Sequence, residues 1–243
     1  MNGTDFFTIN NLTVVGTNAT NALVVHLFNN ADNNTFNNCT FTCTANSTGT
    51  LSSPFSISGT AISATATGPS GSNNIVNNCV LNSGYYGYSL SGPTAAPFPA
   101  NNQIKGCTIN DPYNYGVYSA YNTGLIVDSN IIQQPTRTSL TTFYGVFATT
   151  STASIKITRN RIRNIFLSTP TNTSTSYGIY VSGSGGTLGN EVKIENNIIH
   201  NITNAGILYG IYVLAINHVH VYHNTVSIDH TTSTATGATR GIW

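Results

Sequence analysis

Apolar residues recur along the chain in a short pattern in which inward and outward positions alternate. In each copy, an apolar residue is followed by two polar or small residues, one distinctive residue, one variable residue and a second apolar residue. The eight copies occupy residues 9–14, 36–41, 76–81, 104–109, 127–132, 157–162, 194–199 and 221–226. The pattern favours short β-strands over the sustained apolar stripe of an amphipathic helix.

The distinctive residue of this pattern changes in an ordered way along the chain. It is leucine in the first copy, cysteine in the next three and asparagine in the last four. These residues are Leu12, Cys39, Cys79, Cys107, Asn130, Asn160, Asn197 and Asn224. Like residues have no reason to sort together at a position that faces solvent, whereas stacked neighbours select one another. We therefore predict that the eight residues form one interior column.

A second motif alternates with the first and consists of Tyr-Gly followed by an apolar and an aromatic residue. Its copies occupy residues 86–88, 115–118, 144–147, 177–180, 209–212 and 240–243, the first shortened and the last beginning with Arg. Each repeat thus contains two short β-type runs. The stretches between them are rich in Thr, Ser, Gly and Pro, which predicts turns and loops.

The spacing of the repeats selects one architecture. Successive distinctive residues lie 23 to 40 positions apart. A propeller blade needs four strands and about 40 residues, which is more than most of these intervals supply. One coil of a parallel β-helix fits the shortest interval, and loop insertions account for the longer ones.

The motif pair and the sorted column resemble the right-handed parallel β-helix repeats of the pectin-lyase-like superfamily across nearly the whole chain. The polar loops beside Tyr-Gly-Ile-Tyr strands resemble the long secreted surface proteins of gliding and environmental Bacteroidetes. The resemblance implies an all-β, right-handed parallel β-helix of seven to eight coils with long polar loop insertions. We expect residues 1–243 to form a single domain that is truncated at both ends and belongs to a longer chain with further domains.

The composition narrows the functional classes. Eight Lys and Arg stand against seven Asp and Glu, so the net charge is +1 and only 6% of the residues are charged. This charge does not suit a nucleic-acid binder or attraction to anionic lipid, and no apolar run reaches the roughly 20 residues of a membrane span. The 33 Asn, 37 Thr and 22 Gly supply a neutral, hydrogen-bonding surface. We expect a secreted or cell-surface protein that needs no cofactor.

An interior column would give its polar members partners. The amide of Asn130 could donate to the next coil's Asn160, and so on along the column. The three cysteines would fill the same tight bend as compact, weakly polar groups. A disulfide in the stack is possible but not required, and the sequence leaves open whether Cys43 pairs with Cys39. The four cysteines do not have the spacing of a zinc site.

An outward aromatic column is the first candidate for a ligand site. The residue two after Gly in the Tyr-Gly motif should point outward, next to Gly residues that leave the rings accessible. The column contains Tyr118, Phe147, Tyr180, Tyr212 and Trp243. Its step matches the pitch of a sugar chain, so a polysaccharide or cell-surface glycan could bind along it. Alternatively, the rings only stack on one another under a loop.

A charged strip is the second candidate. We predict one column of Lys156, Lys193 and His220, and an adjacent column that contains Asp128 and Glu195. The two carboxylates would be about 9–10 Å apart, at or beyond the upper end for an inverting glycosidase. The interpretation we favour assigns no catalytic residue and no metal and predicts a non-catalytic stalk or adhesin-like segment. The alternative is a polysaccharide lyase or glycoside hydrolase.

Overall fold

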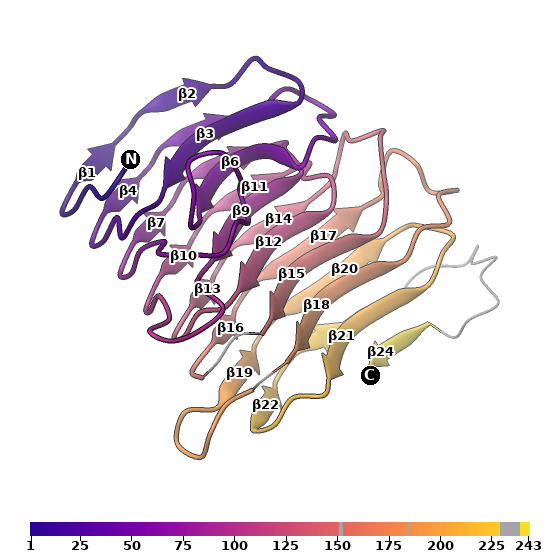
Figure 1. The fold of residues 1–243 in the computed structure, drawn as a ribbon. Coiled ribbons are helices and arrows are strands. Elements are labelled where there is room, and N and C mark those ends of the chain that lie inside the picture. Colours follow the sequence, from indigo (N-terminus) through magenta and orange to yellow (C-terminus); the bar gives the residue numbers. More distant parts are fainter. Residues whose placement is uncertain (151–152, 184, 229–238) are drawn as a thin grey trace.

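The computed structural model describes residues 1–150, 153–183, 185–228 and 239–243. These residues form 24 β-strands and no helix, so this part of the chain contains no helix that could cross a membrane. The strands wind into a parallel solenoid of about seven turns (Figure 1). The prediction of an all-β, right-handed parallel β-helix is confirmed.

Three parallel sheets run along the solenoid, and every third strand joins the same sheet. The first sheet contains β1 (Thr8–Asn10), β4 (Thr35–Asn37), β7 (Ile75–Asn77), β10 (Gln103–Lys105), β13 (Ile126–Asp128), β16 (Lys156–Thr158), β19 (Val192–Glu195) and β22 (Val219–Tyr222). The second contains β2 (Thr13–Val15), β5 (Thr40–Thr42), β8 (Val80–Asn82), β11 (Thr108–Asn110), β14 (Ile131–Gln133), β17 (Arg161–Ile165), β20 (Ile198–Ile202) and β23 (Thr225–Val226). The third contains β3 (Asn21–Leu27), β6 (Leu51–Ile57), β9 (Tyr86–Ser91), β12 (Tyr115–Ala120), β15 (Phe143–Thr149), β18 (Ser176–Ser182), β21 (Leu208–Leu214) and β24 (Arg240–Ile242).

The first motif forms two strands rather than the single run that the sequence predicts. The break lies directly before the distinctive residue, as at Asn78, whose φ of 52° turns the chain from β7 into β8. All eight equivalent residues have a φ between 52° and 62°; they are Asn11, Asn38, Asn78, Gly106, Ser129, Arg159, Asn196 and His223. Asn and Gly adopt this left-handed conformation at the lowest cost, which explains their frequency at this corner.

The apolar residues on both sides of this corner point inward, as the pattern predicts. The inward residues of the six middle coils have no exposed surface; they are Phe36, Val76, Ile104, Val127, Ile157 and Ile194 on the first sheet and Phe41, Leu81, Ile109, Ile132, Ile162 and Ile199 on the second. Their counterparts in the last coil, Val221 and Val226, are half-buried because only one described coil packs against them. The core is therefore a set of aliphatic and aromatic stacks along the solenoid axis.

The four asparagines at the distinctive position form a hydrogen-bonded interior column. Nδ2 of Asn130 donates to Oδ1 of Asn160 at 3.0 Å and to the backbone oxygen of Ile104 at 3.0 Å. Asn160 and Asn197 repeat this arrangement towards the following coil. The buried amides thus avoid the roughly 1–3 kcal/mol that an unpaired polar group costs.

Cys39, Cys79 and Cys107 occupy the same column as buried free thiols. Sγ of Cys107 donates to the backbone oxygen of Val76 at 3.6 Å, in the direction that the asparagine amides use in later coils. The expected interior position is wrong for Leu12, whose side chain is 42% exposed. Its backbone oxygen still accepts from Thr40 at 2.8 Å, so it lies in line with the column, but only one described coil covers it.

A second amide column, which the sequence did not reveal, lies at the other corner of the first sheet. Asn34, Asn74 and Asn102 are buried, and the Nδ2 of each of the first two donates to the next Oδ1, at 3.0 and 3.2 Å. Each of these asparagines lies five residues before a cysteine of the first column. In later coils, the position five residues before the first-column asparagine is apolar; these residues are Leu125, Ile155, Val192 and Val219. In the coils from Asn34 to Asn197, a buried asparagine therefore lies at one of the two corners of the first sheet and an apolar or cysteine side chain at the other.

Cys43 does not pair with Cys39, a question that the sequence left open. Both are free thiols, and Cys43 is 1% exposed. Its Sγ donates to the backbone oxygen of Ala22 at 3.4 Å. Burial raises the pKa of the Cys43 thiol to about 11, so Cys43 is an interior packing residue rather than a surface thiol.

Candidate ligand-binding surface

The second half of each Tyr-Gly motif forms a file of rings on the outer face of the third sheet. In-register pairing of β12, β15, β18 and β21 places Tyr118, Phe147, Tyr180 and Tyr212 next to one another. Trp243 follows Tyr212 with a ring centroid distance of 6.5 Å, and its side chain is 53% exposed. The five residues that were predicted to form an aromatic column are therefore neighbours.

A second file of rings runs beside this one and was not proposed as a site from the sequence. It consists of the first residue of each motif; its members are Tyr86, Tyr115, Tyr144, Tyr177 and Tyr209. Strict alternation would send a tyrosine and the residue three places later to opposite faces. The strands depart from alternation at the glycine, since the register pairs Tyr144 with Tyr177 and Val146 with Ile179. Both aromatic residues of the motif therefore point outward.

The glycines of the motif face the interior, so the prediction that they lie on the ring side is wrong. A Cβ at Gly178 would lie 2.7 Å from Cδ1 of Ile199 and 2.5 Å from the backbone oxygen of Gly210. Gly145 meets the interior in the same way, with Ile162 at 2.9 Å. Two consecutive inward residues, glycine and an aliphatic residue, thus separate two outward rings. Glycine is required here by close packing of the coils and not by ligand access.

We call the eight half-buried rings of four adjacent coils the tyrosine ridge; they are Tyr115, Tyr118, Tyr144, Phe147, Tyr177, Tyr180, Tyr209 and Tyr212. Rings of one file stack face to face, as Tyr144 and Tyr177 do with centroids 4.7 Å apart and an interplanar angle of 3°. Rings of different files meet edge to face, as Tyr177 and Tyr180 do at 5.3 Å and 90°. Because neighbouring rings cover the ring faces, the ridge offers ring edges and hydroxyl groups to a ligand.

The eight rings of the ridge carry no formal charge, but Arg240 borders its C-terminal end and donates from Nη1 to the hydroxyl oxygen of Tyr209 at 3.2 Å. None of the strands β9, β12, β15, β18 and β21 contains Asp, Glu, Lys or Arg. Burial, followed by the neighbouring hydroxyl of Tyr144, raises the pKa of Tyr177 to about 12. Burial also raises the pKa of Tyr144 and of Tyr115. These phenols are therefore protonated at neutral pH, and each can donate and accept a hydrogen bond.

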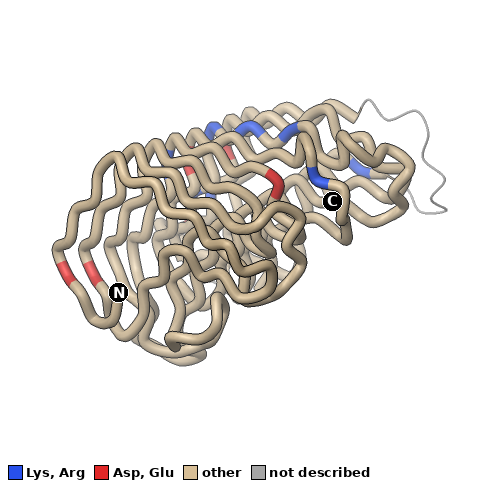
Figure 2. Tube along the Cα trace, turned by 90° about the horizontal axis from the view of Figure 1, so that it is seen from above, with Lys and Arg blue, Asp and Glu red and all other residues tan. Residues whose placement is uncertain are grey.

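The charged strip has the register that the sequence predicts. Lys156 pairs with Lys193, and Lys193 with His220, on the outer face of the first sheet. In the adjacent column, Thr158 separates Asp128 from Glu195. Seven of the eight Lys and Arg residues occur at or after residue 137, and Figure 2 shows several of them gathered along one side of the C-terminal coils. The charged strip thus lies on a different sheet from the tyrosine ridge, whereas Arg240 continues the register of the ridge after Tyr209.

The carboxylate of Asp128 accepts hydrogen bonds from side chains of the neighbouring coil. Nε and Nη2 of Arg159 donate to its two carboxylate oxygens at 2.9 and 2.6 Å, and Oγ1 of Thr158 donates to Oδ1 at 2.7 Å. Burial alone would raise the pKa of Asp128, but the hydrogen bonds from Arg159 and Thr158 outweigh it and hold the pKa below its ordinary value. A carboxylate held in the ionised form does not suit the general acid of a glycosidase.

The residues that could hold a metal are dispersed. Within the described ranges, no three His, Cys, Asp or Glu side chains come together as a possible metal site. His220 contacts Tyr222 with a ring centroid distance of 5.3 Å.

Comparison with known families matches the chain to a family of β-helix proteins. A family model described as "Right handed beta helix region" matches residues 1–162 and, in an overlapping placement, residues 57–226. Together, the two placements include both interior columns and the whole tyrosine ridge. No curated protein and no solved structure matches the chain significantly.

Proposed function

Since this chain belongs to the right-handed β-helix family, we propose that it is a non-catalytic segment of a secreted or cell-surface protein that binds neutral polysaccharide along the tyrosine ridge. In this proposal, the segment acts as a stalk or adhesin-like surface within a longer chain, and its partner is an extended glycan. The fold alone does not choose this function, because the same scaffold can carry many activities.

The observation that carries the proposal is the ridge itself: eight half-buried, uncharged rings on four adjacent strands of one sheet. Repeated ring spacings of 4.7 to 5.7 Å within the files give a ladder of similar contacts along the solenoid. A polymer with a regular repeat can use such a ladder many times, so weak contacts add up along its length.

The mode of contact follows from the stacking. A sugar cannot lie flat on Tyr144 or Tyr177, because each of these rings stacks between two neighbouring rings of its file. Contacts would instead come from ring edges and from the protonated phenol groups. The four ridge strands contain no charged residue, and the cation Arg240 borders the ridge at its end, beside Tyr209. Three of the four coils therefore offer uncharged rings, which favours a neutral polysaccharide over one with carboxylate or sulfate groups.

The alternative, a polysaccharide lyase or glycoside hydrolase, would need a free carboxylate that can exchange protons. The bidentate hydrogen bonding of Asp128 by Arg159 supports a structural role for that carboxylate. Glu195 lies two register steps away with Thr158 between them. This arrangement ties neighbouring coils together and supports the non-catalytic interpretation.

Co-sedimentation with insoluble polysaccharides and affinity electrophoresis with soluble ones would test the proposal, with neutral and anionic polysaccharides in the panel. The key variant is Tyr144→Leu combined with Tyr177→Leu, which removes two hydroxyls and two ring edges but keeps apolar bulk. We expect binding of at least one neutral polysaccharide and a loss of binding of at least tenfold in the double variant. Tyr222→Leu is the matched control, because Tyr222 is a 49% exposed tyrosine on the first sheet.

The same incubations also test the alternative. Release of reducing ends or unsaturated products that disappears in Asp128→Asn or Glu195→Gln would overturn the non-catalytic assignment. Binding that is equally strong in the double variant and in Tyr222→Leu would show that the ridge is not the binding surface.

A further inference from the structure

A pocket lies at the opposite end of the solenoid from the charged strip, where three successive coils pass from the third sheet to the first. Residues 28–34 follow β3, residues 58–74 follow β6 and residues 92–102 follow β9. Together, these connections line a half-open pocket of about 360 Å³. This volume is within the range of about 300–1,000 Å³ that small-molecule sites occupy.

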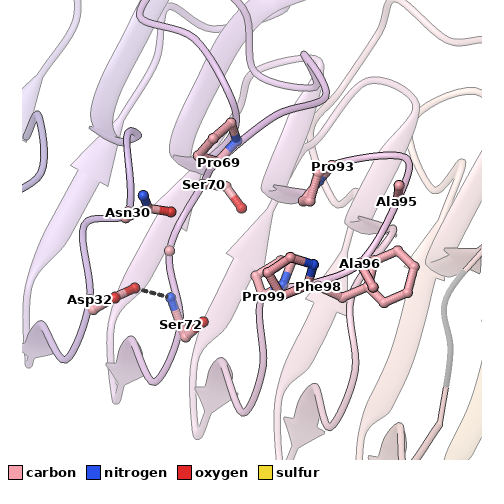
Figure 3. A pocket seen from close by; sticks show the side chains of 12 residues that line it. Asn30, Asp32, Pro69, Ser70, Ser72, Pro93, Ala95, Ala96, Phe98 and Pro99 are labelled. Atoms are coloured by element: carbon pink, nitrogen blue, oxygen red, sulfur yellow. Dashed lines mark hydrogen bonds between the residues drawn. The ribbon is translucent and has the colours of Figure 1, made fainter.

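The pocket combines a polar side and an apolar side. Asn30, Asp32, Ser70 and Ser72 contribute polar groups, and most of the remaining lining comes from Phe98, four prolines and two alanines. In Figure 3, Asn30 and Asp32 stand on one side, the segment with Pro93, Phe98 and Pro99 stands on the other, and Ser70 lies between them. A ligand would therefore meet hydrogen-bonding groups and apolar surface at the same time.

The hydroxyl group of Ser70 lacks a hydrogen-bond partner in the described protein. Ser70 is 2% exposed, and its Oγ has no hydrogen-bond partner among the described residues. A buried hydroxyl left without a partner costs roughly as much as a lost hydrogen bond. The neighbouring Ser72 is different, because its Oγ accepts from the backbone N–H of Ala100 at 3.1 Å. A ligand in the pocket would give Ser70 the partner that the protein does not supply.

The loops around the pocket are held in place before any ligand binds. Oδ1 of Asp32 accepts from the backbone N–H of Ser72 at 2.6 Å, which joins the first two loops. The second amide column also fixes the loops, since Asn74 donates to the backbone oxygen of Ala31 at 2.8 Å and Asn102 donates to that of Gly71 at 2.9 Å. Such preorganisation lowers the conformational entropy that the loops would lose when a ligand binds.

We propose that this pocket binds a single neutral sugar residue, at a site separate from the tyrosine ridge. Asn30 can donate and accept, the Ser70 hydroxyl can do either, and Asp32 can accept, so the site suits hydroxyl groups, which also do both. An ammonium group only donates and would leave the Asn30 amide donors unused. An anionic sugar would face Asp32 with no Lys or Arg among the lining residues. Proline and Phe98 side chains supply apolar contact for the C–H groups of a pyranose ring.

The test measures binding of methyl glycosides to the full chain by ligand-observed NMR and calorimetry. The probes are methyl glucoside, galactoside, mannoside and N-acetylglucosaminide, with glucuronate and butylamine as charged comparisons. We expect a neutral glycoside to bind with a Kd on the order of 1 mM and both charged probes to bind at least fivefold more weakly.

Ser70→Ala is the decisive variant, because it removes an unpartnered hydroxyl and should leave the unfolding midpoint unchanged or slightly raised. We expect it to weaken glycoside binding at least fivefold, and Asp32→Asn, which keeps an acceptor for Ser72, to weaken binding as well. Phe98→Ala should also reduce binding, whereas Phe7→Ala should not, since Phe7 is 49% exposed and lies outside the pocket. Absence of binding by every neutral glycoside, preference for a charged probe, or full binding by Ser70→Ala would each overturn the proposal.

Discussion

Nδ2 of Asn130 and Oδ1 of Asn160 lie 3.0 Å apart in adjacent coils, and the same Oδ1 also accepts from the backbone N–H of Asn130 at 3.0 Å. One oxygen thus satisfies two donors of the preceding coil. The link repeats from Asn160 to Asn197 and from Asn197 to Asn224. Each interior asparagine therefore relies on the next asparagine towards the C-terminus for the acceptor of its backbone and side-chain N–H groups.

Asn160→Ala should therefore destabilise the solenoid strongly. The change leaves the backbone and side-chain donors of Asn130 without their acceptor and removes the donor to the backbone oxygen of Val127. We expect a loss of about 2–4 kcal/mol in the free energy of unfolding, measured by urea denaturation. Asn10→Ala is the control, because Asn10 is exposed and should change stability by no more than about 0.5 kcal/mol. Equal losses in the two variants would contradict the assigned role of the column.

Gly178→Ala should also destabilise the protein, for a steric reason. The new methyl group would lie 2.7 Å from Cδ1 of Ile199 and 2.5 Å from the backbone oxygen of Gly210. Overpacking of this kind costs about 1–3 kcal/mol, which thermal or urea unfolding would detect. Gly241→Ala is a matched control at the same motif position, because a Cβ there meets no atom within 4 Å. A stable Gly178→Ala variant would mean that adjacent coils can separate at this position.

The pair of Asp128 and Arg159 should contribute to stability in a pH-dependent way. The pKa of Asp128 is held below its ordinary value of 3.8, so the folded chain binds this proton less readily than the unfolded chain. The contribution is therefore complete above about pH 4 and is lost as the pH falls through the lowered pKa. Unfolding free energies measured between about pH 2 and 6 should fall less steeply in Asp128→Asn than in the wild type. Parallel curves would show that the pair does not act in solution.

The Cys43 thiol should resist modification in the folded protein. Cys43 is a buried free cysteine, and burial raises the pKa of its thiol to about 11. Little thiolate forms at Cys43 at neutral pH, and solvent does not reach its sulfur. We expect a thiol reagent such as Ellman's reagent to label Cys43 only under denaturing conditions, as peptide mapping would show. Rapid labelling of Cys43 in the absence of denaturant would contradict its interior position.

The sequence was sufficient for the repeat, the sheet type and most of the interior. Ile157, Asn160 and Ile162 recur at the same places in other copies, and positions that repeat in consecutive coils become stacked neighbours. Leu12 was placed wrongly because the pattern identifies its position in a coil but not how many coils cover that position. The sequence also did not predict that the first motif forms two strands. A single residue with a left-handed backbone, such as Asn78, divides a run of residues that looks continuous in the sequence.

The candidate site was predicted only in part. Alternation places Tyr180 outward correctly but would send Tyr177 inward, because it does not foresee two consecutive inward residues at Gly178 and Ile179. The pocket around Ser70 had no signal in the sequence. Its walls come from three loops of unequal length that belong to different coils.

By itself, the sequence determined which residues stack, because a solenoid brings each repeat against the next and turns periodicity directly into contact. The tertiary structure alone decided how the surfaces built on that core are arranged. It placed the two tyrosine files side by side, covered their ring faces and brought the loops of Asp32, Ser70 and Phe98 around one cavity. These features depend on local departures from the repeat and on loop paths in space, neither of which a period along the chain specifies.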